Sequence, residues 1–106
     1  MSFPHTNQQV LQQSGMSQAN DNLQAARRRL YDVMGERNAA MRTWSELKAQ
    51  VMRQRPRADS ELAQRFEKAR EELRRIEKVM GEANLAVVKC INEHAAASAR
   101  LTRDLL

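Results

Sequence analysis

Apolar residues recur at spacings of three and four from about Ser17 onward, until Pro56 interrupts the pattern. This period places them on one side of an α-helix, so it predicts a first long helix that ends before the proline. Asp59 or Ser60 can cap a second helix, and Glu61 adds a favourable charge to its first turn. The sequence therefore predicts an all-α fold, a long antiparallel, coiled-coil-like helical hairpin with its turn near residues 54–59.

Both predicted helices carry an apolar stripe with heptad spacing. In the first helix the stripe comprises Leu23, Ala26, Leu30, Val33, Arg37, Ala40, Trp44, Leu47 and Val51. In the second helix it comprises Leu62, Phe66, Ala69, Leu73, Ile76, Met80, Ala83, Val87, Cys90, His94, Ala97 and Leu101. Folding the chain back at the proline pairs Leu30 with Ala83, Trp44 with Ala69, Ala40 with Leu73 and Ala26 with Val87. Large side chains then meet small ones, which lets the two helices approach closely.

Arg37 is the one charged member of the first stripe, and in this register it faces Ile76. We expect its guanidinium to extend to a flanking carboxylate while its methylene groups stay on the core. A polar group that fixes the register is the alternative interpretation.

Residues 28–41 resemble residues 74–87, with eight identical pairs among the fourteen. The shared Val-Met-Gly-Glu-x-Asn core indicates an internal duplication, which gives the hairpin a pseudo-two-fold axis. Each helix then has a wide apolar face, and one hairpin contact cannot cover two such faces. The surplus apolar residues are predicted to form a second packing surface: Met34, Met41, Val79, Ala86 and Ile91. We expect this surface to complete a helical bundle, either in a homo-oligomer or with a helix of another protein.

Residues 1–22 are rich in Gln and Asn and contain no Lys or Arg, so we interpret them as a polar N-terminal tail that precedes a hairpin domain at 23–106. A short helix around Asn7 to Gln13 fits the same residues. The single cysteine and the absence of a signal-peptide pattern favour a cytoplasmic protein, while signal-independent secretion and incorporation into a virion stay open. No apolar stretch approaches the roughly 20 residues of a membrane span.

Few residues suggest catalysis. Cys90 and His94 lie one helical turn apart and supply half of a tetrahedral metal site, but both also fit the apolar stripe. The three glycines are isolated, so no phosphate-binding loop is present. We therefore expect no enzymatic activity, no metal site and no cofactor.

Positive charge is concentrated between residues 23 and 75, which hold fourteen of the 18 basic residues and eight of the 13 acidic ones. Four arginines near the turn are candidate contacts for nucleic acid or an acidic partner: Arg53, Arg55, Arg57 and Arg65. Aromatic residues that could stack on bases are scarce. The sequence favours a non-enzymatic assembly module, such as an oligomerising adaptor, a small chaperone, or a component of a bacterial secretion system or phage particle. The alternative is a basic, dimeric hairpin that binds nucleic acid.

Overall fold

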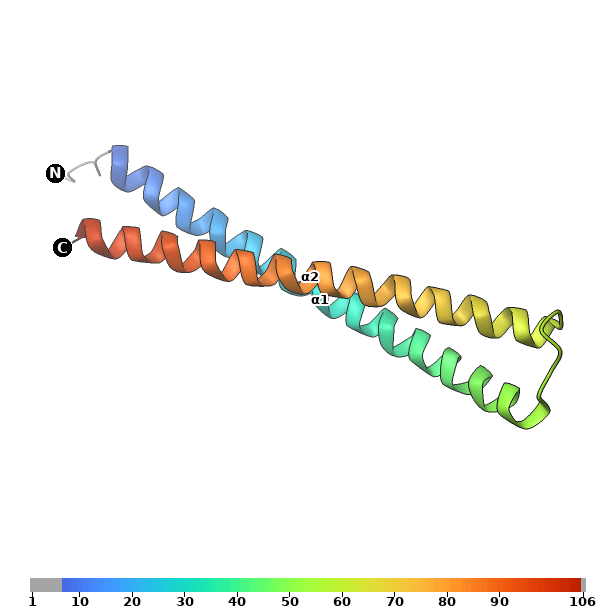
Figure 1. Ribbon diagram of the computed structural model, residues 1–106. Coiled ribbons are helices and arrows are strands. Elements are labelled where there is room, and N and C mark those ends of the chain that lie inside the picture. The colour runs from blue at the N-terminus through green and yellow to red at the C-terminus, as the bar shows by residue number, and fades with distance from the viewer. Residues whose placement is uncertain (1–6, 106) are drawn as a thin grey trace. The chain divides into compact units, whose positions relative to one another are not determined.

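The computed structural model describes the backbone of residues 7–105 and the side chains of residues 15–105. Two long helices account for most of these residues: α1 (Asn7–Gln54) and α2 (Glu61–Leu105) (Figure 1). No strand occurs within this described range. The predicted all-α fold is confirmed.

The first helix begins earlier than the sequence pattern alone suggested. The predicted polar tail at 1–22 is helical from Asn7 onward, and Ala19 is buried. The physical reason is that Gln, Ser and Ala tolerate a helix when no proline intervenes, and no proline follows Pro4 before the turn. Residues 1–6 lie outside the described part of the chain.

The turn is built from standard helix-ending and helix-starting devices. Arg55 has a φ of 46°, and its N–H donates to the carbonyl of Val51 at 2.8 Å, so it ends α1 as a left-handed C-terminal residue followed by Pro56. At the start of α2 the backbone N–H of Ala63 donates to Ser60 Oγ at 3.1 Å. Of the two residues predicted to cap the second helix, Ser60 is therefore the one whose side chain accepts this hydrogen bond.

The chain divides into two compact units, each containing a piece of both helices. The turn unit is Leu30–Ala83, in which α1 and α2 form an antiparallel hairpin. The terminal unit combines Met1–Arg29 with Asn84–Leu106, so that the beginning of α1 packs beside the end of α2.

The predicted stripes form the seam between the helices in both units. Every residue of both stripes is buried or half-buried. The most buried side chains are Ala19, Leu23, Val33, Leu47, Leu73, Ile76, Ala83, Val87 and Ala97. No polar side chain among the described residues is buried. The heptad spacing thus predicted which side of each helix faces the other.

Two cross-helix contacts in the turn unit define the local register. The rings of Trp44 and Phe66 stack, with centroids 6.3 Å apart, one helical turn from the predicted neighbour Ala69. Arg37 Nη2 lies 3.6 Å from Glu77 Oε1, beside the predicted neighbour Ile76. The expected extension of Arg37 toward a flanking carboxylate is confirmed.

Candidate interaction surfaces

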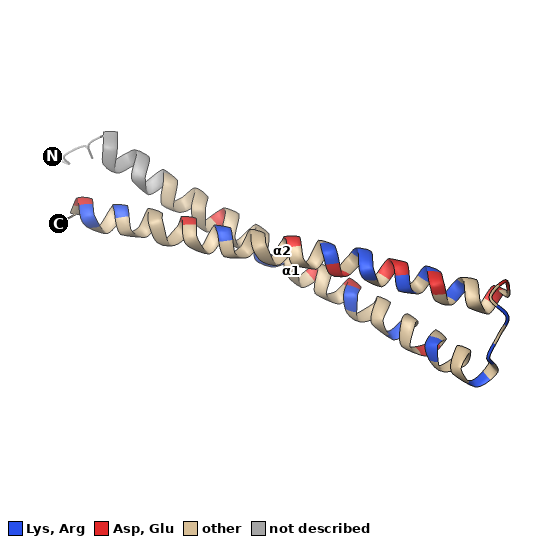
Figure 2. Ribbon diagram, in the orientation of Figure 1, with Lys and Arg blue, Asp and Glu red and all other residues tan. Residues whose placement is uncertain are grey.

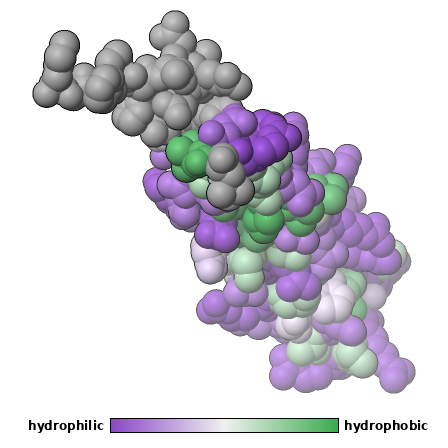
Figure 3. All heavy atoms as spheres, turned by 90° about the vertical axis from the view of Figure 1, so that its left-hand side faces the viewer, coloured by the Kyte–Doolittle hydropathy of each residue, from purple (hydrophilic) through white to green (hydrophobic). Residues whose placement is uncertain are grey.

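Apart from Leu105 near the end of α2, the large aliphatic side chains exposed among the described residues of the terminal unit follow one another along α2. Leu85 is 70% exposed, Val88 48% and Ile91 43%. They are spaced three residues apart, so each lies next to the following one on the helix surface. In the space-filling view, hydrophobic atoms reach the surface among hydrophilic ones (Figure 3). Exposed aliphatic residues in successive turns are typical of a surface that packs against another protein.

Charge is sparse around these residues. Of the chain's 31 charged residues, 22 lie in the turn unit, where basic and acidic residues are interspersed, most densely along α2 (Figure 2). Between Asn84 and Ala99 the only Lys, Arg, Asp or Glu residues are Lys89 and Glu93. Lys89 Nζ lies 3.9 Å from Glu93 Oε1, so this flank carries a matched pair of charges. The desolvation that packing requires is therefore smaller here than in the turn unit.

The residues predicted to form the second packing surface are placed unevenly. In the turn unit, Met34 is 43% exposed, whereas Met41 and Val79 are half-buried beside the seam. In the terminal unit, Ala86 and Ile91 are both exposed. These two are five residues apart and so lie on different sides of α2, about 140° from each other. The structure therefore does not gather the five residues into one patch.

Leu85 and Val88 were missed as surface residues by the sequence reasoning. They belong to the longest apolar run in the chain, Leu85-Ala86-Val87-Val88. A run of four residues covers a full turn of helix, so when Val87 occupies the seam its neighbours must point away from it. The length of the run was the signal that could have identified them.

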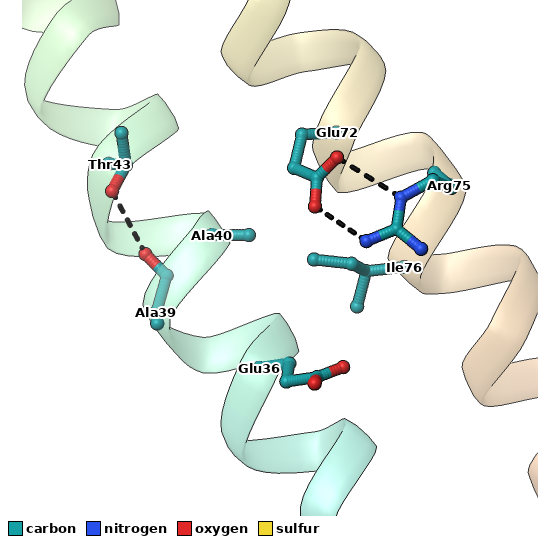
Figure 4. Close-up of a pocket in the computed structure, with 7 residues that line it drawn as sticks. All are labelled: Glu36, Ala39, Ala40, Thr43, Glu72, Arg75 and Ile76. Atoms are coloured by element: carbon teal, nitrogen blue, oxygen red, sulfur yellow. Dashed lines mark hydrogen bonds and ion pairs between the residues drawn. The ribbon is translucent and has the colours of Figure 1, made fainter.

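A shallow groove of about 360 Å³ lies between the helices of the turn unit (Figure 4). Ala39 and Ala40 leave this space because their side chains are too short to fill it. On α2 the groove is bordered by Ile76 and by the pair Glu72 and Arg75.

Two of the three charged residues that line the groove, Glu72 and Arg75, already pair with each other. Arg75 donates to both carboxylate oxygens of Glu72, at 2.6 and 3.1 Å. These hydrogen bonds hold the pKa of Glu72 below its ordinary value, and the pKa of Arg75 is raised by Glu72 and, more weakly, by Glu36. A carboxylate paired in this way is a poor general base. The groove is best described as a surface depression between small side chains.

The four candidate arginines are all exposed. Arg53 lies in the last turn of α1, Arg55 and Arg57 lie between the helices, and Arg65 lies in the second turn of α2. Arg57 Nε is 3.8 Å from Asp59 Oδ1, so its charge is partly offset. We call these four residues the arginine tip. The tip is accessible to an acidic partner, but neighbouring carboxylates reduce the positive potential around it.

Cys90 and His94 are half-buried members of the seam on α2. Within the described part of the chain, no group of three or more His, Cys, Asp or Glu side chains is arranged to hold a metal ion. Over the same range neither helix contains a segment long and apolar enough to cross a bilayer.

Comparisons with known proteins add no family to these observations. No protein-family model, curated protein or solved structure matches the chain. The structure defines the chain as an all-α helical hairpin.

Proposed function

We propose that this chain is a non-enzymatic assembly module that associates with further copies of itself through the outer face of α2. This outer face consists of Asn84, Leu85, Val88, Ile91 and Asn92, all of them exposed. The observation that carries the proposal is the row of three aliphatic side chains, exposed by 43–70% in a stretch with little charge. Packing stabilises an assembly by about 25 cal/mol for each Å² of apolar surface that it removes from water.

The thin core of the hairpin supports a second copy as the occupant. Among the described residues, only small and medium side chains are buried in either unit. Association would thicken that core without any further element of the chain.

Replacing Val88 by Glu tests this proposal, because the substitution places two carboxylates in the proposed interface. We expect Val88→Glu to be monomeric by light scattering at concentrations where the wild-type chain is assembled. Asn20→Glu is the matched control, since it adds the same charge at an exposed site on α1 of the same unit. A wild-type chain that is itself monomeric would overturn the proposal, as would assembly that Val88→Glu leaves unchanged.

Nucleic-acid binding through the arginine tip is the second candidate function. The observation that favours it is the exposure of Arg53, Arg55, Arg57 and Arg65. Phosphate contacts release counterions, so binding of this kind weakens steeply as salt is raised. If the tip binds DNA or RNA, a variant with Ser at positions 53, 55 and 57 loses retention on an oligonucleotide column. Unaltered retention by that variant removes the tip from consideration.

A further inference from the structure

The order of residues on the outer face of α2 is symmetric about Val88. Leu85 and Ile91 lie three residues before and after it, and Asn84 and Asn92 lie four residues before and after it. At 100° per residue, all five fall within about 60° of Val88 around the helix, so they share one side. None of the five belongs to the seam, and all are exposed.

We infer that two copies of the chain pair through this face in antiparallel orientation, with a two-fold axis at Val88. The inference rests on the proposed self-assembly and adds its geometry. In a two-fold interface the same patch of each copy faces the other copy. A residue at a given distance before the axis therefore meets, in the second copy, the residue at the same distance after the axis. Leu85 then packs on Ile91 of the second copy, and Val88 packs on its own counterpart.

This arrangement also pairs the polar residues at the two ends of the face. Asn84 meets Asn92 of the second copy at each end of the aliphatic row. Each carboxamide carries both a donor and an acceptor, so the two can hydrogen-bond across the interface. Within the described part of the chain neither amide has a side-chain hydrogen bond that would have to break first. The apolar row is thereby bounded by polar contacts, as in other stable interfaces.

Antiparallel pairing is favoured over parallel pairing by the pattern itself. An in-register parallel pair sets each residue against its own copy, whatever the order of residues along the helix. Symmetry about a central residue is required only when the two helices run in opposite directions. Opposed helix dipoles favour the same orientation. Beyond the face, Ala95 and Ala99 are small and exposed, so the second helix can continue past them without a clash.

Disulfide trapping at the axis tests this geometry. In a Cys90→Ala background, Val88→Cys places two thiols on the axis of the pair. Helices packed about 8–10 Å apart bring facing Cα atoms within disulfide range. Ala95→Cys is the matched control, an exposed site about 20° from Val88 around α2, whose counterpart would lie about 21 Å away along the helices in the antiparallel pair. Circular dichroism and light scattering under reducing conditions check that both variants keep the wild-type helix content and mass.

We expect mild oxidation to produce a covalent dimer from Val88→Cys and little from Ala95→Cys. Cross-linking of both variants would indicate parallel pairing and overturn the inference. A dimeric mass with no cross-link at Val88→Cys would overturn the inference while leaving the proposed self-assembly intact. A monomeric wild-type chain would overturn both.

A mixing experiment gives an independent check in case a thiol at the axis disturbs packing. Chains carrying Leu85→Cys and chains carrying Ile91→Cys, both in the Cys90→Ala background, are oxidised separately and together. Antiparallel pairing about Val88 predicts that the mixture forms a mixed disulfide more readily than either variant alone links to itself. Equal or greater linking within each separate variant contradicts the inferred axis.

Discussion

Arg37 of α1 reaches across the hairpin to Glu77 of α2, with 3.6 Å between Nη2 and Oε1. The Arg37 side chain is only one-third exposed, and its Nε is buried without a hydrogen-bond partner. The ion pair therefore satisfies part of the guanidinium and leaves part of it desolvated. The same heptad position of α1 holds Leu23, Leu30, Trp44 and Val51 in the other turns of the stripe. We therefore expect Arg37 to be a local cost to stability.

Replacing Arg37 by Leu should stabilise the hairpin by about 1 kcal/mol, because it removes the unpartnered Nε and adds an apolar side chain opposite Ile76. Thermal unfolding at matched protein concentration measures the change. Glu77→Gln is the control that breaks the ion pair alone, and we expect it to cost less than 1 kcal/mol because both groups are partly exposed. A large loss of stability in Arg37→Leu would mean that the guanidinium supports the fold.

Replacing Ser60 by Ala should destabilise the chain by about 1 kcal/mol, because the N–H of Ala63 loses the hydroxyl that accepts its hydrogen bond. Chemical denaturation followed by circular dichroism gives the change in free energy of unfolding. Asp59→Ala is the control, since the Asp59 side chain is exposed and contacts only Arg57 through an ion pair. Equal effects of the two substitutions would show that Ser60 is not the cap.

Replacing Phe66 by Ala should expose Trp44, whose ring stacks on it with a 6.3 Å centroid separation. Trp44 is the only tryptophan, so its fluorescence reports this contact directly, and we expect a red shift of the emission. The lost packing should cost about 2 kcal/mol, less than for a fully buried ring, because both rings are half-buried. Lys48→Ala leaves the stack in place and removes the side chain whose ammonium group lies 4.8 Å from the centroid of the Trp44 ring, so it should leave the emission nearly unchanged. An unshifted spectrum in Phe66→Ala would rule out the stack.

Glu72 should titrate below the ordinary range for glutamate, because Arg75 donates two hydrogen bonds to its carboxylate and so lowers its pKa. A lowered pKa in the folded state means that the pair contributes stability above the ordinary pKa and loses it as the pH falls through the lowered value. Carboxyl chemical shifts measured against pH by NMR would give the pKa. Arg75→Gln should return it toward the ordinary value, and an identical titration in both chains would contradict the pairing.

The seam was predictable from sequence because its cause is periodic. Each helix must bury one side, and heptad spacing specifies that side whatever the details of packing. The start of α1 at Asn7 was harder to predict from the sequence, because uncharged polar residues neither favour nor forbid a helix.

The outer face of α2 was only partly predicted, since Ile91 was identified and Leu85 and Val88 were not. Their significance depends on knowing that Val87 occupies the seam, which determines where its neighbours point. Symmetry about Val88 is visible in the sequence only after the exposed side of α2 is known.

The molar mass of the purified wild-type chain is the most direct test of self-assembly. Light scattering at low and high salt, with absorbance at 260 and 280 nm recorded together, measures mass and nucleic-acid content in one experiment. Apolar packing predicts a dimer or larger assembly that is free of nucleic acid and insensitive to salt. A 12.2 kDa monomer that co-purifies with nucleic acid and releases it at high salt would contradict self-assembly and favour the arginine tip as the functional site.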